Sequence, residues 1–132
     1  MDYQDVLDKA FVAMKNAYAP YSNYFVGACV KCKDGKYFLG ANIENASYGA
    51  ANCGERSAVF AAYSNGYRKD DIASLAIVTS GDRIGYPCGI CRQVLSELLN
   101  QDTPIILSNG KDTTITNMKK LLPFQFNQED LK

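Results

Sequence analysis

Residues 73–79 read Ala-Ser-Leu-Ala-Ile-Val-Thr, residues 89–100 read Gly-Ile-Cys-Arg-Gln-Val-Leu-Ser-Glu-Leu-Leu-Asn, and residues 105–108 read Ile-Ile-Leu-Ser. The first and last segments are short, strongly apolar runs, which is typical of strands buried inside a sheet. The middle segment is long enough for a helix and follows a loop that contains glycine and proline. A strand, a helix and a further strand in this order favour a right-handed parallel crossover, so the chain is predicted to have an α/β fold.

The segments before and after this unit continue the alternation of helices and strands. Pro20 is expected to stop the first helix, and Asp34-Gly35 predicts a hairpin turn between two strands. The second helix is alanine-rich and apolar nearly all round, so we expect it to be buried. The further expected elements are helix 2–18, strands 25–32 and 36–42, helix 53–64, strand 113–115 and helix 117–122. They predict a mixed sheet with helices on both faces, in one domain over residues 1–132.

The composition is that of a globular domain, with 47% hydrophobic and 21% charged residues in a chain of 132. Fourteen Lys and Arg balance fourteen Asp and Glu. The resulting net charge of zero argues against a nucleic acid or an acidic membrane surface as the partner. No apolar run approaches the roughly 20 residues that span a bilayer. The acidic first residues lack the layout of a signal peptide, so we expect a cytoplasmic protein.

Five cysteines and no histidine limit the possible chemistry. An odd number of cysteines in a reducing compartment argues against a disulfide framework. Without an imidazole, the usual serine and cysteine hydrolase triads are excluded. Acid–base chemistry must therefore use a carboxylate, a lysine, a tyrosine or a water molecule held by a metal ion.

Three of the cysteines lie at the predicted starts of two helices. Cys53 opens the second helix, and Cys88 and Cys91 open the third, one turn apart. The unpaired N–H groups and the dipole at a helix N-terminus favour thiolates. Three thiolates can hold a zinc ion and leave its fourth position for water, which is the arrangement of a catalytic site. Glu55, two residues after Cys53, is placed to take a proton from that water.

Each of these signals also has a simpler interpretation. A lone Cys88-x-x-Cys91 could be a redox pair or half of a structural zinc site, and a first-turn glutamate is favoured at any helix start. Cys29 and Cys32 could supply the other half. Three residues apart in a strand, however, they point to opposite faces, so we expect them to be packing residues. The combined pattern therefore favours the catalytic zinc site.

Cys53-Gly-Glu-Arg56 followed by Pro87-Cys-Gly-Ile-Cys91 resembles the paired zinc motifs of nucleoside and nucleobase deaminases. Other segments narrow the resemblance to the small, homotetrameric, zinc-dependent cytidine deaminases, over nearly the whole chain. These segments are Ala17-Tyr-Ala-Pro-Tyr-Ser22, Val26-Gly-Ala28, Asn42-Ile-Glu-Asn-Ala-Ser-Tyr48, Cys91-Arg-Gln-Val-Leu-Ser-Glu97 and Leu121-Leu-Pro123. The resemblance implies a three-layer α/β/α fold with a mixed five-stranded sheet. It also implies one Zn²⁺ per subunit and a homotetramer whose active sites are completed by neighbouring subunits.

The roles of individual polar residues follow from this resemblance. It implies that Asn42 and Glu44 hold the ribose 3′-hydroxyl, that the Gly54 N–H binds the pyrimidine O2, and that Tyr24 lies against the pyrimidine ring. Arg56 would hydrogen-bond the zinc thiolates and draw charge off the sulfurs. The family commonly has alanine at the position of Gly54 and phenylalanine at that of Tyr24, so this chain departs from the family at both.

Three further contacts to the substrate are expected from the same resemblance. Tyr48 and Phe126 would come from neighbouring subunits to close the pocket, with Phe124 as a second candidate for the C-terminal position. The Tyr86 carbonyl, just before the second cysteine motif, could accept a hydrogen bond from the substrate amine. By residue type alone, the aromatic side chains would be ordinary packing residues.

The expected reaction is hydrolytic deamination of cytidine and 2′-deoxycytidine, as in pyrimidine salvage, to uridine or 2′-deoxyuridine and ammonia. Glu55 would pass a proton from water to N3 and then carry one to the leaving amine. Two alternatives stay open: a related deaminase acting on a nucleic acid or a cytosine-bearing antibiotic, and a structural zinc module without activity. Zero net charge weighs against nucleic acid, and a structural module would need a fourth protein ligand.

Overall fold

The computed structural model describes residues 2–132 and contains every helix and strand that the sequence predicts, with ends shifted by a few residues. The strands are β1 (Val26–Cys32), β2 (Tyr37–Ala41), β3 (Ile72–Thr79), β4 (Ile105–Ser108) and β5 (Thr113–Thr116). The α-helices are α1 (Gln4–Met14), α2 (Gly54–Ser64), α3 (Gly89–Leu98) and α4 (Met118–Leu121). Short 3-10 helices span Tyr48–Ala50, Lys69–Asp71 and Gln128–Leu131. Within residues 2–132, no helix is both long and apolar enough to cross a lipid bilayer.

The five strands form one mixed sheet in the order β2-β1-β3-β4-β5. β3 and β4 run parallel, while β1 pairs antiparallel with both β2 and β3, and β4 pairs antiparallel with β5. α3 lies between β3 and β4 in the chain. The predicted parallel crossover and the mixed five-stranded sheet are therefore confirmed.

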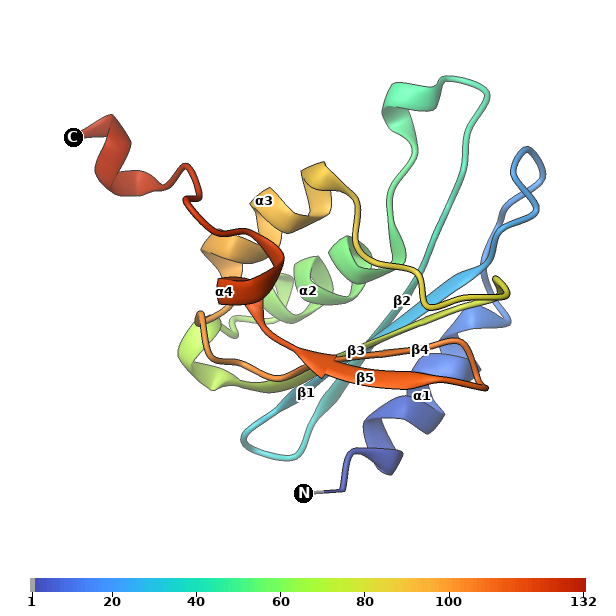
Figure 1. Ribbon diagram of the computed structural model, residues 1–132, viewed down its shortest axis with the longest axis horizontal. Coiled ribbons are helices and arrows are strands. Elements are labelled where there is room, and N and C mark those ends of the chain that lie inside the picture. The colour runs from blue at the N-terminus through green and yellow to red at the C-terminus, as the bar shows by residue number, and fades with distance from the viewer. Residues whose placement is uncertain (1) are drawn as a thin grey trace.

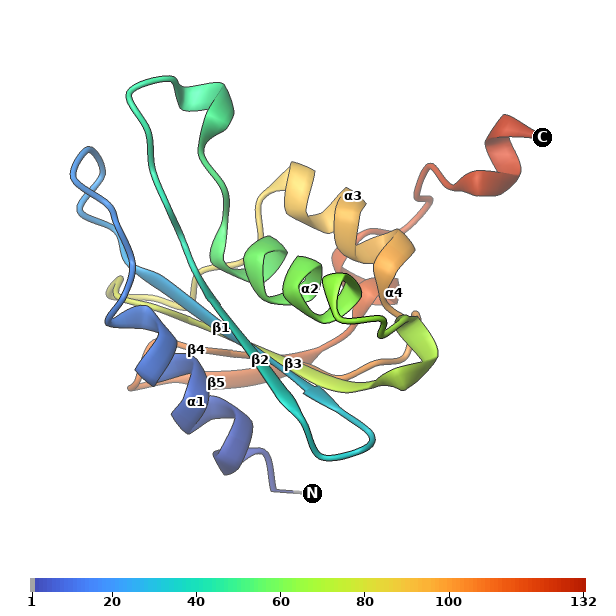
Figure 2. The same cartoon turned by 180° about the vertical axis from the view of Figure 1, so that it is seen from behind.

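Helices cover both faces of this sheet, α1 on one side and α2, α3 and α4 on the other (Figures 1 and 2). Alternate residues of a strand point to opposite faces, so β1 contributes to two separate cores. Val30 packs in the core beneath α2 and α3, whereas Cys29 packs beneath α1. This is the predicted three-layer α/β/α arrangement.

Cys29 and Cys32 lie in different cores, as their spacing along a strand predicts. Cys29 packs with α1 and Cys32 with α2 and α3; both thiols are buried and free. Burial raises the pKa of Cys29 to about 12 and that of Cys32 to about 11, because a buried thiolate loses its hydration. Both therefore behave as small packing residues rather than metal ligands.

α1 ends four residues earlier than predicted, at Met14 instead of Tyr18. The Tyr18 N–H donates to the Asn42 carbonyl oxygen at 2.9 Å, and the Tyr18 carbonyl accepts from the Glu44 N–H at 2.8 Å. The chain leaves the helical path because these residues pair with the segment after β2. That pairing fixes the backbone of two expected substrate-binding residues.

The expected burial of the second helix holds, in the single chain, for the side that faces the sheet. Ala58, Val59 and Ala62 face the sheet and are fully buried, but Phe60 is 40% exposed. A helix on the outer layer of the fold can bury only the side that faces the sheet. Its outward apolar side chains therefore stay uncovered in the single chain.

Two glycines allow helices to approach the β1–β2 hairpin from opposite faces. A β-carbon on Gly27 would lie 2.1 Å from the Ala10 carbonyl oxygen in α1. A β-carbon on Gly40 would lie 2.4 Å from the Ala58 nitrogen in α2. Both are contacts with backbone, which can be relieved only by moving a whole helix.

Gly27→Ala is therefore expected to lower the free energy of unfolding by about 3 kcal/mol, at the upper end of the usual cost of overpacking a core. Urea denaturation followed by circular dichroism measures the change. Gly49→Ala is the matched control, because a β-carbon at Gly49 meets no atom within 4 Å; its effect should stay within about 0.5 kcal/mol. Equal stability of the two variants would contradict the close approach of α1.

A charged cluster ties the start of α1 to the hairpin. The Asp5 carboxylate accepts hydrogen bonds from the Lys31 ammonium at 2.7 Å and the Tyr37 hydroxyl at 2.5 Å. The hydrogen bond from Lys31 is the main cause, and that from Tyr37 the next, of the lowering of the Asp5 pKa from 3.8 to about 2. The Asp5 side chain is 38% exposed, so water weakens the pair.

This cluster predicts a stability change at acid pH. A carboxylate with a lowered pKa stabilises the folded state above about pH 4, and that contribution is lost as the pH falls from about 4 to about 2. Asp5→Asn should lower the free energy of unfolding by about 0.5–1 kcal/mol at pH 7, and most of this difference from wild type should be lost near pH 2. Urea titrations at both pH values measure this difference. Asp8→Asn, on the same helix but outside the cluster, is the control; if Asp5→Asn stays equally destabilised at pH 2, the ionic contribution is refuted.

Candidate active site

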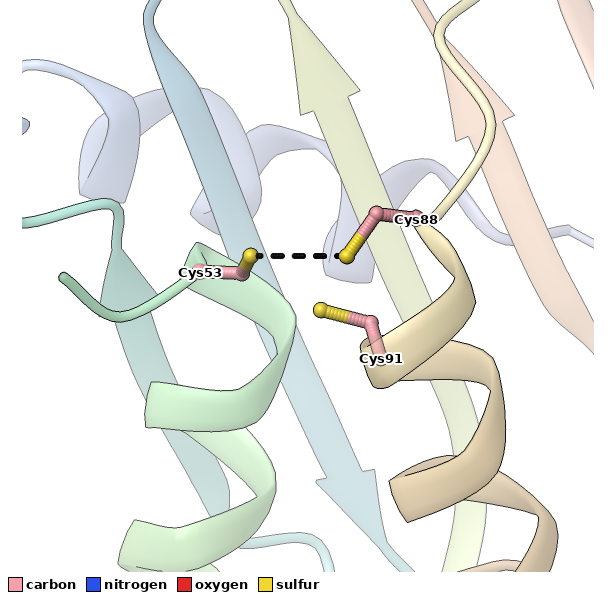
Figure 3. Close-up of side chains that lie close together, drawn as sticks. All are labelled: Cys53, Cys88 and Cys91. Atoms are coloured by element: carbon pink, nitrogen blue, oxygen red, sulfur yellow. Dashed lines mark hydrogen bonds between the residues drawn. The ribbon is translucent and has the colours of Figure 1, made fainter. Parts of the chain in front are cut away.

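Three cysteine sulfurs meet where the N-termini of α2 and α3 come together on one face of the sheet. Cys53 is the N-cap of α2, Cys88 is the N-cap of α3, and Cys91 lies in the first turn of α3. Figure 3 shows the three side chains pointing toward one another, and their sulfurs all lie within 4.8 Å of each other. The structure thus brings together the three cysteines that the sequence singled out.

The spacing of these sulfurs fits a zinc ion. Thiolates bound to zinc at about 2.3 Å in a tetrahedral arrangement lie about 3.8 Å apart. The Cys53 and Cys88 sulfurs are 4.0 Å apart, and all three thiols are free rather than in disulfides. Soft sulfur donors of this number and geometry are typical of zinc.

The helix starts leave these sulfurs available as ligands. Neither N-cap side chain accepts a capping hydrogen bond from a backbone N–H of its own helix, although cap side chains commonly do. Both caps have extended backbone. α2 and α3 pack side by side on the same face of the sheet (Figure 2), which is why their N-termini converge.

Charged and polar neighbours favour the thiolate form of Cys53. A hydrogen bond from the Cys91 thiol is the main cause, and the Arg56 guanidinium a further one, of the lowering of the Cys53 pKa to about 5. The same hydrogen bond, together with burial, raises the pKa of Cys91. Arg56 Nη2 lies 3.4 Å from the Cys53 sulfur. Arg56 is therefore in contact with the sulfur cluster, as the resemblance implied.

Glu55 lies beside the cluster and is almost completely buried, with 4% of its surface exposed. Burial raises the pKa of its carboxyl group to about 7, and the negative charge of Cys53 adds to the effect. The backbone N–H of Glu55 lowers this pKa, but by less than burial raises it. A carboxyl group of this kind can both accept and release a proton near neutral pH.

A cavity of about 630 Å³ opens from this cluster, and nearly all the predicted site residues line it. Those residues are Tyr24, Asn42, Glu44, Tyr48, Cys53, Glu55, Arg56, Tyr86 and Cys88. Cys91 is fully buried behind the cavity wall, and Gly54 is buried next to Val26 and Asn42. Phe124 and Phe126 do not line the cavity of their own chain.

Asn42 and Glu44 line the same cavity and are held rigidly by hydrogen bonds. The Asn42 amide oxygen accepts from the Val26 N–H at 2.9 Å, and its nitrogen donates to the Tyr24 carbonyl at 2.8 Å. Glu44 accepts from the N–H groups of Tyr21 and Ser22 at 3.0 and 3.1 Å and from the Ser22 hydroxyl. The Ser22 hydroxyl is the main cause of the lowered pKa of Glu44, so this carboxylate is ionised and fixed.

Some lining residues were not predicted from the sequence. Ser22 orients Glu44, while Thr79 and Ile90 form part of the cavity wall. Ser22 stands in the Ala17–Ser22 motif, which was the only sequence signal for it. In the sequence, Thr79 is only the last residue of a predicted strand. The arrangement of the strands in the sheet brings it to the cavity wall, and no local pattern indicates this.

A family model described as the zinc-binding region of cytidine and deoxycytidylate deaminases matches residues 1–106. The cytidine deaminase of Halalkalibacterium halodurans is 46% identical over 132 residues, which cover 99% of this chain and 98% of that protein. This chain belongs to the cytidine deaminase family. The resemblance drawn from its motifs is therefore confirmed, and a structural zinc module without activity is not favoured.

Solved cytidine deaminases share the fold. The enzyme from Burkholderia pseudomallei, at 42% identity, superposes with a TM-score of 0.91 over 96% of this chain and 100% of that chain. The enzyme from Mycobacterium tuberculosis, at 34% identity, gives a TM-score of 0.79 over 96% of this chain and 98% of that chain. The zinc ion of this deaminase family fits the three-sulfur cluster by donor type and by spacing.

Proposed function

We propose that this chain, as one catalytic domain, deaminates free cytidine and 2′-deoxycytidine to uridine or 2′-deoxyuridine and ammonia. One observation carries the proposal: a single cavity is lined by Cys53 and Cys88 of the three-sulfur cluster, a buried glutamate, and a fixed amide and carboxylate. The cluster and the glutamate suit attack on a ring carbon that bears an amine. The amide and the carboxylate suit a sugar hydroxyl group, because an amide donates and accepts hydrogen bonds and a carboxylate accepts them.

Cys53, Cys88 and Cys91 would hold the zinc ion. When bound, zinc lowers the pKa of a water molecule at its open position to near neutrality. Arg56 donates to the Cys53 sulfur and so offsets part of the negative charge of three thiolates, which would otherwise weaken that acidifying effect.

Glu55 moves the protons in the proposed reaction. Its carboxylate takes a proton from the attacking water and delivers it to pyrimidine N3, which makes C4 more electrophilic. After the water oxygen has bonded to C4, Glu55 takes the remaining proton from that oxygen and carries it to the exocyclic amine. The C4–N bond then breaks to release ammonia, and the oxygen becomes the C4 carbonyl of the product. The burial of Glu55 and its raised pKa support both steps.

The other lining residues would hold the nucleoside in place. The Gly54 N–H would bind the pyrimidine O2, Tyr24 would lie against the ring, and the Tyr86 carbonyl would accept from the leaving amine. Asn42 and Glu44 would bind the ribose 3′-hydroxyl. The rigid contacts of Asn42 and Glu44 support this role, because pre-positioned groups lose little entropy on binding.

Nucleic acid is a poor fit for this cavity. Of the described residues that line it, Arg56 alone is cationic, and Arg56 already contacts the Cys53 sulfur. The Glu44 carboxylate would repel a phosphate group. A free nucleoside is therefore favoured over a polynucleotide.

We also propose a homotetramer in which Tyr48 and Phe126, or Phe124, close the cavity of a neighbouring subunit. All three side chains are strongly exposed in the single chain, as is Phe60 on α2. A tetramer would cover this apolar surface. Sedimentation velocity tests the proposal, and a monomer at micromolar concentration would refute it.

We further propose a cytoplasmic role in pyrimidine salvage. The five free thiols support this compartment, because the cytosol keeps thiols reduced.

The direct test is incubation of the purified protein with cytidine, with and without a zinc chelator. We expect ammonia and uridine to form and the chelator to abolish both. A cytosine-containing oligonucleotide serves as the competing substrate. Turnover of the oligonucleotide without turnover of cytidine would overturn the proposed substrate class.

A further inference from the structure

A buried hydroxyl group in the cavity has no hydrogen-bond partner. Thr79, the last residue of β3, is 4% exposed and lines the cavity, yet its Oγ1 makes no hydrogen bond with any residue among 2–132. Burying a hydroxyl group without a partner is unfavourable. A ligand that brings a donor or acceptor to this point would therefore gain binding energy that an apolar ligand would not.

Gly85 packs closely against Thr79 and Tyr24 at this point of the cavity. A β-carbon on Gly85 would lie 3.2 Å from Thr79 Oγ1, 2.9 Å from Thr79 Cγ2 and 2.1 Å from the Tyr24 hydroxyl oxygen. Two hydroxyl groups, from Thr79 and Tyr24, thus border the same small region of the cavity. The Tyr24 hydroxyl, one of the two departures from the family pattern, makes this region more polar than a phenylalanine would.

The proposed binding mode determines which edge of the pyrimidine faces this region. Glu55 and the Gly54 N–H, both on α2, would take N3 and O2. The edge opposite N3 carries C5, and it must then face away from α2, toward β3 and the loop before α3. Thr79 is the last residue of β3, Gly85 belongs to the loop before α3, and both line the cavity.

We propose that Thr79 Oγ1, with the Tyr24 hydroxyl beside it, binds a polar substituent on pyrimidine C5, and that the enzyme therefore accepts 5-hydroxymethylcytidine in preference to 5-methylcytidine. This inference rests on the proposed function. A hydroxymethyl group can hydrogen-bond Thr79 Oγ1, whereas a methyl group leaves that oxygen buried against a carbon atom. Both substituents add one carbon at C5, so the comparison isolates the hydroxyl group.

The experiment measures kcat/KM for cytidine, 5-methylcytidine and 5-hydroxymethylcytidine with the zinc-loaded protein. The wild-type protein should favour the hydroxymethyl over the methyl substrate by about tenfold, the effect of one well-formed buried hydrogen bond. Thr79→Val has nearly the same shape without the hydroxyl group, and it should bring the ratio to one or below. The ratio is taken within each variant, so a general loss of activity cancels.

Three further variants make the result decisive. Thr79→Ser keeps the hydroxyl group and should keep the preference, while Thr79→Ala should lose it even if the valine variant fails to fold. Thr103→Val removes a buried threonine hydroxyl outside the cavity and should leave the ratio unchanged.

A tenfold preference that survives in the valine and alanine variants would overturn the inference, and so would a wild-type ratio near one. Normal turnover of cytidine in that case would leave the proposed function intact; no turnover of any of the three nucleosides would overturn both.

Discussion

Glu55→Gln is expected to reduce kcat/KM for cytidine by about a thousandfold, within the usual contribution of a general acid–base group. Glutamine has the shape of glutamate but cannot accept a proton from water or release one to N3. Because Glu55 lies among the buried residues at the start of α2, an isosteric change should leave the sulfur cluster and the cavity in place. We therefore expect zinc content and nucleoside binding to remain close to wild type.

Stopped-flow or steady-state loss of cytosine absorbance measures turnover, and calorimetry with the product uridine measures binding. The matched control is Glu97→Gln on the exposed side of α3, which should retain full activity. If Glu55→Gln kept more than a tenth of the wild-type kcat/KM, Glu55 would not be the proton shuttle. A variant that lost uridine binding along with turnover would assign Glu55 a structural role instead.

Cys88→Ala is expected to abolish zinc binding at stoichiometric metal and to reduce turnover to background. The remaining two thiols, Cys53 and Cys91, can still contact a metal ion, but a site with two ligands binds zinc far more weakly. Metal binding is linked to folding, so loss of the ion should also lower the free energy of unfolding by at least about 3 kcal/mol relative to the zinc-loaded wild type. Atomic absorption gives the zinc content, and thermal melting with and without chelator gives the stability.

The matched control for this variant is Cys29→Ala, which removes a buried thiol that lies beneath α1. It should lose some stability through packing but keep one zinc ion per chain. The wild-type melting temperature should fall on chelation to near the value of Cys88→Ala, whereas chelation should not change the variant. Full zinc occupancy in Cys88→Ala would refute the three-cysteine ligand set.

The spacing of residues along the chain is enough to predict the chemical half of the site. Thiols at the starts of two helices, with a glutamate two positions after the first, define the chemistry because a helix N-terminus places its side chains in a known direction. By contrast, Asn42 and Glu44 carry no such local signal. Only the resemblance to a family assigned them a role, since a strand end with an amide and a carboxylate is common in proteins.

The sequence by itself determined the order of helices and strands, the α/β class and the residues suited to bind zinc, because these depend on local periodicity, turn residues and neighbours in the chain. Tertiary structure alone decided that Cys53 meets Cys88 and Cys91, that α1 stops early so that Tyr18 can pair with the segment after β2, and that one side of α2 stays uncovered. It also placed Thr79 and Gly85 against the cavity beside Tyr24. Such contacts join residues far apart in the chain, and their geometry depends on how helices pack on the sheet, which no local pattern encodes.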